Sequence, residues 1–181
     1  VLRTKKNLRL LKVDMSKEQG GHNMYVSMNG GILVQEQDIE TKTVTADMCV
    51  TEAQPDEAQL TDLDFAWRIV KHVKSNAIVV VKDGATLGVG AGQMNRVGSA
   101  KIALEQAEAA LKEAGKDIKA EGLVLGSDGF FPFDDTVTLA AEYGIKAIVQ
   151  PGGSVRDEDS VKKSNECGIT MLCTGMRHFK H

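Results

Sequence analysis

Three segments of the chain combine residue types suited to ligand binding with a position directly after a strand-like apolar run. The first, Ser127 to Asp135, holds three of the chain's five phenylalanines within four residues and has acids at both ends. In open α/β sheets, ligands bind at the connections that follow the carboxyl ends of strands, so this loop predicts a binding site. The alternative is a turn whose phenylalanines fill the core, and spacing alone gives the two interpretations equal weight.

The second segment, Gly88 to Arg96, has three alternating glycines between a strand and a helix. Such glycines let a ligand or another backbone approach closely, and the helix N-terminus that follows offers free N–H groups. The spacing matches neither a Walker loop nor the GxGxxG dinucleotide fingerprint. Arg96 is a rigid, planar donor suited to a carboxamide or a carboxylate, which slightly favours a ligand-binding interpretation.

The third segment is the glycine-bearing loop from Gln150 to Ser154, expected at the same edge of the sheet as the other two. At a helix-to-strand junction, Asn76 offers a hydrogen-bond donor and acceptor, although its spacing fits a helix C-cap better. The basic tail from Met176 to His181 either frays or folds back on the protein. Phe179 favours the second alternative, because a phenylalanine gains nothing in solvent.

The bulk composition excludes several classes of protein. With 42% hydrophobic and 26% charged residues over 181 positions, one ordinary globular domain is the default. A net charge of −3 gives no electrostatic basis for binding nucleic acid, and no apolar stretch approaches the roughly 20 residues of a membrane span. Three cysteines without a CxxC pair and four histidines without HxxxH or HxE spacing predict neither a disulfide framework nor a zinc site. We expect a reducing, cytoplasmic compartment, and Val1 suggests that the chain was cut from a longer protein.

Strands and helices alternate through most of the chain. Asp56, with Gln59 three residues on, predicts a helix N-terminus followed by a broad apolar face that ends near residue 75. Residues 77–82 and 86–90 read as a hairpin turned at Asp83-Gly84, and residues 97–114 as a helix. Beyond it we expect strands at 122–125, 145–150 and 169–173 and helices at 135–143 and 155–167, hence a mixed sheet with helices on both faces. Upstream, we expect a strand at 8–13, two short strands within 24–37 and a connector at 41–55.

Five segments, in order, resemble the bifunctional purine biosynthesis family that combines AICAR transformylase with IMP cyclohydrolase. They are residues 74–79, 88–96, 127–133, 150–154 and 177–181. The resemblance runs from about residue 5 to the last residue and points to the carboxy-terminal part of the transformylase domain. It implies a three-layer, cytidine-deaminase-like α/β subdomain at 56–181, with a mixed sheet, helices on both faces and no zinc. Residues 1–55 would then be strands and a connector from the preceding part of that domain.

The activity that the resemblance implies is formyl transfer. The family moves a formyl group from the cosubstrate 10-formyltetrahydrofolate to the 5-amino group of AICAR, giving FAICAR. IMP cyclohydrolase activity belongs to a separate amino-terminal domain. The expected partners are AICAR, folate, the remaining transformylase subdomain, the cyclohydrolase domain and a second copy in a homodimer, with no nucleic acid and no membrane.

The resemblance also assigns roles to seven residues. They are Asn76 and His181 at the formyl-transfer centre, Arg96 at the AICAR carboxamide, Phe130 in the base pocket, Pro132 and Asp135 facing the folate, and Arg177 at the AICAR phosphate. These residues suit the reaction, in which a weakly nucleophilic amine loses a proton while the formyl oxyanion is stabilised in a dry pocket.

One departure from the family limits the expected activity. The catalytic Lys-His pair of the family sits in an upstream Phe-Lys-His motif that this sequence does not contain. Lys71-His72 lies within the predicted helix, and Lys180-His181 belongs to the family's terminal motif. We therefore predict that the chain alone is inactive. The alternative is a non-catalytic nucleotide- or folate-binding module derived from the same domain.

Overall fold

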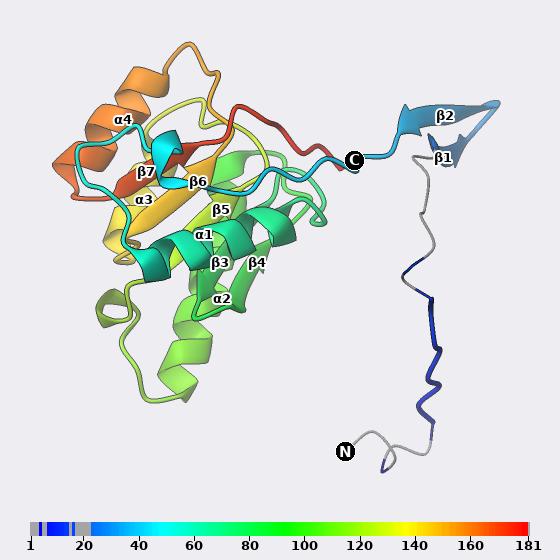
Figure 1. Cartoon of the computed structure of the whole chain (residues 1–181), viewed down its shortest axis with the longest axis horizontal. Coiled ribbons are helices and arrows are strands. Elements are labelled where there is room, and N and C mark those ends of the chain that lie inside the picture. Colours follow the sequence, from blue (N-terminus) through cyan, green and yellow to red (C-terminus); the bar gives the residue numbers. More distant parts are fainter. Residues whose placement is uncertain (1–3, 5–6, 15, 17–22, 181) are drawn as a thin grey trace. The chain divides into compact units, whose positions relative to one another are not determined.

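The computed structural model describes residues 4, 7–14, 16 and 23–180, which form two compact units (Figure 1). The first unit is Val1–Ile39 and the second is Glu40–His181. Within the second unit lie all the described residues of the predicted site.

The first unit contains an antiparallel hairpin of β1 (Asn23–Met28) and β2 (Gly31–Glu36). Asn29 and Gly30 make the two-residue turn, and the positive φ of +81° at its second position suits a glycine. The two strands predicted within 24–37 are therefore confirmed. The strand predicted at 8–13 is wrong: these residues have no regular secondary structure, and no described strand pairs with them to complete a ladder.

The second unit is built on a five-stranded sheet in the order β4-β3-β5-β6-β7. The strands are β3 (Ile78–Lys82), β4 (Ala85–Gly90), β5 (Val124–Ser127), β6 (Ala147–Gln150) and β7 (Thr170–Cys173). Strands β5, β6 and β7 are parallel, whereas β3 runs antiparallel to both of its neighbours. The predicted mixed sheet is confirmed.

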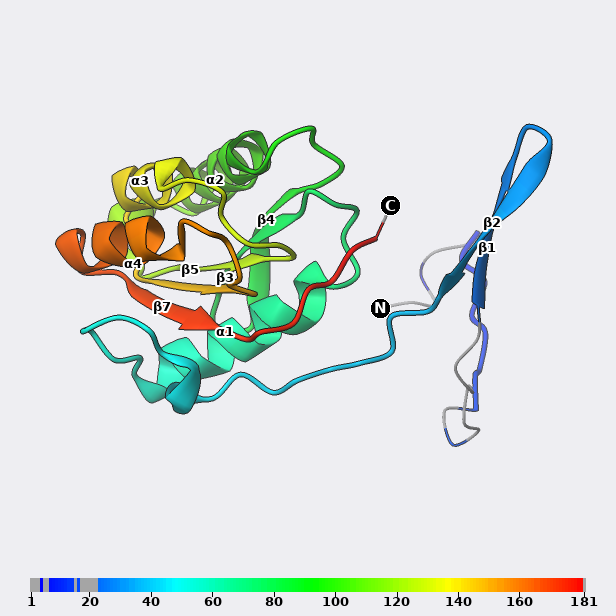
Figure 2. The same ribbon diagram turned by 90° about the horizontal axis from the view of Figure 1, so that it is seen from above.

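Helices cover both faces of this sheet, as Figure 2 shows. They are α1 (Glu57–Val70), α2 (Arg96–Glu113), α3 (Asp135–Glu142) and α4 (Asp157–Glu166). The side chains of β3 alternate between the two faces: Ile78 and Val80 pack with α2 and α3, while Val79 and Val81 pack with α1. The three-layer α/β architecture expected from the sequence is thus confirmed.

Local signals set the start of two helices. Asp56 accepts a hydrogen bond from the Gln59 backbone N–H at 2.7 Å, and the Gln59 side chain accepts one from the Asp56 N–H at 3.1 Å, which completes the predicted capping box. Asn95 caps α2 by accepting from the Gly98 N–H at 2.7 Å. Helix α1 ends at Val70, a few residues earlier than predicted.

Two of the alternating glycines serve helix packing. A Cβ on Gly88 would lie 1.8 Å from the Ala103 carbonyl oxygen, and one on Gly90 would lie 1.9 Å from that of Ser99. Of the two explanations open for these glycines, the structure therefore selects the close approach of another backbone, that of α2.

Residues 40–55 belong to the second unit and pack against its sheet and α1. Val44 is buried in the α1 side of the core, and Cys49 forms an antiparallel bridge with Leu172 of β7. The Val50 N–H donates to the Met171 carbonyl at 2.9 Å, so this segment covers the outer edge of β7. The subdomain boundary predicted between residues 55 and 56 stays a prediction.

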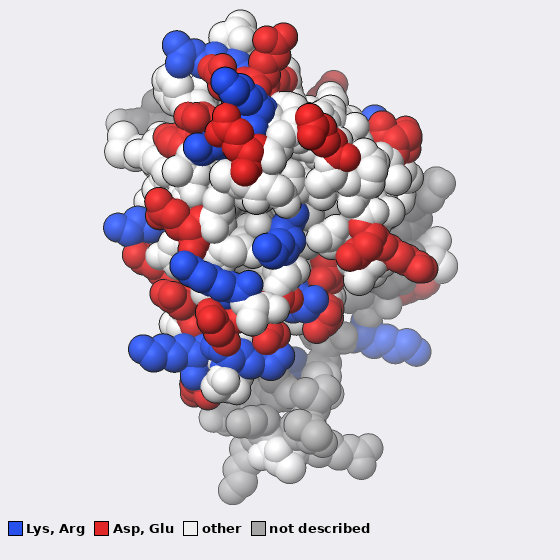
Figure 3. All heavy atoms as spheres, turned by 90° about the vertical axis from the view of Figure 1, so that its left-hand side faces the viewer, with Lys and Arg blue, Asp and Glu red and all other residues white. Residues whose placement is uncertain are grey.

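The surface carries charges of both signs. On the face drawn in Figure 3, Lys and Arg side chains are interleaved with Asp and Glu side chains. In the described part of the chain, no helix has the length and apolar character that crossing a membrane requires.

Candidate functional site

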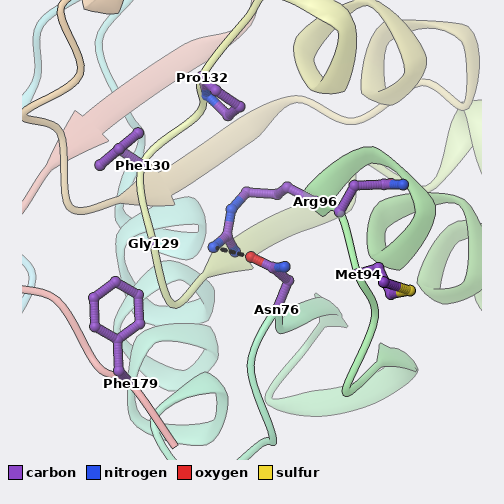
Figure 4. Close-up of a pocket in the computed structure, with 8 residues that line it drawn as sticks. Asn76, Met94, Arg96, Gly129, Phe130, Pro132 and Phe179 are labelled. Carbon is purple, nitrogen blue, oxygen red and sulfur yellow. Dashed lines mark hydrogen bonds between the residues drawn. The ribbon is translucent and has the colours of Figure 1, made fainter. Parts of the chain in front are cut away.

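A pocket of about 330 Å³ lies where several chain segments meet, next to the start of β3 and the end of β5. Because β3 runs antiparallel to β5, the start of β3 meets the end of β5, and Ile78 pairs with both Ser127 and Gly90. The segment before β3, the β4–α2 loop, the loop after β5 and the tail after β7 therefore converge (Figure 4). The residues that line the pocket are Asn76, Met94, Asn95, Arg96, Gly129, Phe130, Pro132 and Phe179.

A buried ion pair lies behind this pocket. The side chain of Arg96 is 7% exposed and that of Asp128 is fully buried. Nη1 of Arg96 donates to the Asp128 carboxylate, to the Ser127 hydroxyl at 2.9 Å and to the Ala77 carbonyl at 3.3 Å. The carboxylate thus holds the guanidinium beside the carboxyl end of β5.

Asp128 also fastens neighbouring segments. Its carboxylate accepts hydrogen bonds from the Ser75 hydroxyl and, at 3.0 Å, from the Ala77 N–H. Its carbonyl accepts from the His178 N–H at 3.1 Å, which attaches the C-terminal tail. One buried residue therefore joins the segment before β3, the loop after β5 and the tail.

Asn76 is held at both ends of its side chain. Its Oδ1 accepts from Arg96 Nη2 at 2.8 Å (Figure 4). Its Nδ2 donates to the Gln93 carbonyl at 2.9 Å. The C-cap of α1 is Lys71, so the interpretation of Asn76 as a helix cap, which the spacing favoured, is wrong. The amide instead ties the β4–α2 loop to the guanidinium.

The loop after β5 passes so close to Arg96 that it needs a glycine. A Cβ on Gly129 would lie 2.4 Å from Arg96 Nη2 and 3.4 Å from Cε1 of Phe179. The phenylalanines of this loop divide between the two predicted roles, core filling and ligand binding. Phe131 is fully buried in the core, whereas Phe130 forms a wall of the pocket.

Two arginines stack on this aromatic loop. The Arg177 guanidinium lies 4.8 Å from the centre of the Phe130 ring, and that of Arg156 lies 5.1 Å from the centre of the Phe133 ring. Both contacts are cation–π interactions. Arg177 also approaches the third loop, because a Cβ on Gly153 would lie 3.6 Å from its Nη2.

Four of the seven predicted site residues meet at the pocket: Asn76, Arg96, Phe130 and Pro132. Arg177 contacts the pocket wall without lining the pocket. Asp135 lies at the start of α3, where its carboxylate accepts from the Thr136 N–H at 2.7 Å, and it does not line the pocket. His181 is outside the described residues.

No functional role was predicted from the sequence for three residues at or behind the pocket, Asp128, Met94 and Asn95. The signal for Asp128 was present, since a charged residue directly after a buried strand must find a partner inside the protein. For Asn95 the signal was its residue type and position, because asparagine directly before a helix is a favoured N-cap, as it is for α2.

The Lys-His pair at 71–72 makes contacts outside the pocket. Lys71 Nζ donates to the Thr41 hydroxyl at 3.3 Å, and the His72 carbonyl accepts from Lys180 Nζ at 3.1 Å. Neither residue lines the pocket, in keeping with its position at the end of α1.

The third predicted loop lies over a cysteine. A Cβ on Gly152 would lie 3.2 Å from Sγ of Cys173, and Gly153 donates its N–H to the Asp157 carboxylate at 2.6 Å. Burial raises the pKa of the Cys173 thiol to about 11, and the Asp157 charge adds to the effect. A neutral thiol of this kind is a poor nucleophile. Within the described residues, no group of three or more His, Cys, Asp or Glu side chains is arranged to hold a metal ion.

Comparison with known proteins places the chain in a family. The sequence profile described as "AICARFT/IMPCHase bienzyme" matches residues 1–106. The chain is 55% identical to the bifunctional purine biosynthesis protein PurH of Anoxybacillus flavithermus and 54% identical to that of Bacillus subtilis, in each case over all 181 residues. It spans about a third (34%) of the length of these two relatives.

Among solved structures, a diaminohydroxyphosphoribosylaminopyrimidine deaminase/5-amino-6-(5-phosphoribosylamino)uracil reductase from Thermotoga maritima aligns with a TM-score of 0.40 and 24% identity. That alignment covers 62% of this chain and 34% of the other. The profile match over more than half of the residues and the identity over the whole chain are decisive. The chain belongs to the AICARFT/IMPCHase bienzyme family.

Proposed function

We propose that the chain is the carboxy-terminal part of the AICAR transformylase region of its family and holds substrates for formyl transfer from 10-formyltetrahydrofolate to AICAR. The observation that supports this most directly is the hydrogen bond between Asn76 and Arg96 beside the Phe130 wall. These residues come from three separate segments of the chain, and the family resemblance assigns Asn76 to the formyl-transfer centre and Arg96 and Phe130 to AICAR binding.

In the proposed reaction the 5-amino nitrogen of AICAR attacks the formyl carbon. A tetrahedral intermediate forms, the bond from that carbon to N10 of the folate breaks, and N10 takes up a proton as tetrahydrofolate leaves. The amine loses a proton in the same sequence, so the products are FAICAR and tetrahydrofolate. Donors fixed before the reaction stabilise the developing oxyanion best, because they need not reorganise.

The side chains around the pocket suit a planar, anionic ligand. Phe130 offers its ring to the imidazole of AICAR. Nη1 of Arg96 donates only to protein atoms. Nε and the second N–H of Nη2 have no acceptor among the described residues, so these donors can hydrogen-bond the carboxamide of AICAR. Arg177 is exposed beside Phe130 and carries the charge for the phosphate.

The volume of the pocket is enough for part of one substrate, not for both substrates. At about 330 Å³ it lies at the lower end of the roughly 300–1,000 Å³ typical of ligand pockets. It can hold the head of one substrate, so we assign the folate to the open side at Pro132 and Asp135, with His181 beside the reacting centre. The acid–base pair would come from the family's upstream Phe-Lys-His, and the chain alone would be inactive.

The test compares the isolated chain with a chimera in which it replaces the matching third of the Anoxybacillus flavithermus protein. Both are mixed with AICAR and 10-formyltetrahydrofolate, and tetrahydrofolate release is followed. We expect turnover by the chimera, a large loss on Arg96→Met, no loss on the surface control Glu105→Gln, and no turnover by the isolated chain. Native-like turnover by the isolated chain would refute its incompleteness. A chimera that binds AICAR without turnover would favour the non-catalytic binding module instead.

A further inference from the structure

Met94 is a methionine at the rim of the pocket whose side chain lies almost entirely in solvent. It lines the pocket and is 98% exposed, against 54% for Met28 and 0% for Met171. The three other described methionines are half-buried: Met24, Met48 and Met176. Single exposed apolar side chains are common on proteins, so the exposure alone carries little weight. The place of Met94 and the rigidity of its backbone make the exposure informative.

The backbone on both sides of Met94 is anchored. The Gln93 carbonyl accepts from the Asn76 side chain at 2.9 Å and from the Asn76 N–H at 3.3 Å. On the other side, Asn95 caps α2 by accepting from the Gly98 N–H at 2.7 Å. Because the residues before and after it are fixed, the fold itself directs the Met94 side chain outward at the rim.

The cosubstrate, rather than AICAR, brings an aromatic ring to this rim. In the proposed reaction AICAR lies inside the pocket against Phe130, and in the view of Figure 4 Arg96 separates the Phe130 ring from the Met94 side chain. The formyl group of 10-formyltetrahydrofolate is carried on N10, and N10 is bonded directly to the p-aminobenzoyl ring. That ring therefore enters the mouth of the pocket together with the formyl group, within reach of a flexible side chain on the rim.

A methionine is well suited to cover such a ring and is also open to oxidation. Its thioether is polarizable and its side chain rotates freely, so the sulfur can approach the edge of an aromatic ring. Hydrogen peroxide transfers one oxygen atom to a lone pair of this sulfur, which is oxidised to the sulfoxide while the peroxide is reduced to water. The sulfoxide is polar and packs poorly on an apolar ring, and methionine sulfoxide reductases reverse the change.

We propose that Met94 covers the p-aminobenzoyl ring of the cosubstrate and is a site of reversible oxidation that weakens cosubstrate binding. The proposal rests on the formyl-transfer function proposed above, and it adds a contact and a modification that the family resemblance does not assign. Oxidation of Met94 leaves AICAR binding unchanged, because the residues assigned to AICAR contain no sulfur.

The test uses the Anoxybacillus flavithermus chimera, treated with hydrogen peroxide and then with catalase. Peptide mass spectrometry follows the oxidation of each methionine. Calorimetric titration gives the dissociation constants of AICAR and of tetrahydrofolate, which keeps the same aromatic ring, without any turnover. We expect Met94 to be oxidised faster than Met28 and Met171. Loss of a sulfur–aromatic contact of ordinary strength should raise the dissociation constant of tetrahydrofolate roughly 2- to 10-fold.

Three variants separate Met94 from every other residue that peroxide oxidises. Met94→Leu keeps an apolar side chain that peroxide does not oxidise, so the treatment should no longer change tetrahydrofolate binding. Met28→Leu is the matched control, because Met28 is exposed but does not line the pocket, and it should keep the full peroxide effect. Met94→Gln places a polar side chain of similar length at the rim and should weaken tetrahydrofolate binding without peroxide.

Three results would overturn the proposal. The first is tetrahydrofolate binding that is unchanged after Met94 has been oxidised, or that falls equally in Met94→Leu. The second is an equal loss of AICAR and tetrahydrofolate binding. The third is fast oxidation of Met94 in the isolated chain but slow oxidation in the chimera without ligand, because another part of the polypeptide would then cover it. All three leave the proposed function standing, whereas an untreated chimera that binds neither ligand would refute the function and this contact together.

Discussion

Replacing Asp128 by asparagine tests whether one carboxylate organises the pocket. Asp128 is fully buried and bound to the guanidinium of Arg96, and it also accepts from the Ser75 hydroxyl and the Ala77 N–H. Asparagine has nearly the same volume, so Asp128→Asn creates no cavity. It removes the negative charge that pairs with the guanidinium and turns the acceptor that faces the Ser75 hydroxyl into a donor.

The expected cost is large because the remaining charge stays buried. Removing one partner of a buried ion pair typically destabilises a protein by about 3–5 kcal/mol. For a protein of this size, 1 kcal/mol corresponds to roughly 2–4 °C in melting temperature. We therefore expect Asp128→Asn to lower the melting temperature by about 6–20 °C.

Urea unfolding at constant pH measures the free energy, and a thermal scan measures the shift in melting temperature. The matched control is Glu105→Gln, which breaks the exposed pair with Lys101 and should cost less than about 1 kcal/mol. Adding Arg96→Met should recover part of the loss, because it removes the unpaired charge. If Asp128→Asn costs no more than the control, or if Arg96→Met makes it worse by its full single-variant cost, the buried pair does not organise this region.

Two further substitutions and two measurements on Cys173 follow from contacts in the second unit. Gly129→Ala should cost about 1–3 kcal/mol in urea unfolding, because the new Cβ displaces the Arg96 guanidinium, 2.4 Å away. Gly88→Ala should cost about 3 kcal/mol or more, because its Cβ would lie 1.8 Å from the Ala103 carbonyl oxygen, a backbone atom that cannot rotate aside. Cys173, with its pKa raised from 9.0 to about 11, should react with iodoacetamide at pH 8 about 100-fold more slowly than an ordinary thiol. The contribution of the Cys173 thiol to the free energy of unfolding is fully present below pH 9. It is lost as pH rises from 9 toward 11, because the thiol ionises at lower pH in the unfolded chain than in the folded protein.

Each of these expectations has an internal control. Gly31→Ala should be nearly neutral, because no atom lies within 4 Å of its added Cβ and its φ is not positive. The exposed Cys167 should react with iodoacetamide at an ordinary rate. Equal costs for Gly31→Ala and Gly88→Ala, or equal rates at the two cysteines, would contradict the packing described here.

Structural features that depend on residues close together in the sequence could be predicted. The capping box at Asp56 and Gln59 involves neighbours three residues apart, and the Asp83-Gly84 turn lies between two β-branched runs. The alternation of strands and helices after Asp56 follows from local periodicity and gave the layered sheet. Placing Asn76, Arg96, Phe130 and Pro132 at one site needed the family resemblance in addition.

Features that depend on distant partners could not be predicted. The role of Asp128 depends on an arginine 32 residues away, and the need for glycine at Gly88 depends on a helix packed above it. The segment 8–13 shows the opposite error: its apolar residues favour a strand, but a strand forms only beside a partner, and none is present among the described residues.

The ion pair at Asp128 is best explained by positioning rather than by stability. An apolar pair of similar volume would hold the core at least as well, because desolvating two charges offsets most of their attraction. An apolar pair could not, however, form side-chain hydrogen bonds with Ser75, Asn76 and Ser127 at once. These segments approach the pocket from different elements. It follows that weakening the pair should loosen the pocket before the fold is lost, so a variant that remains folded at low temperature should already bind AICAR more weakly.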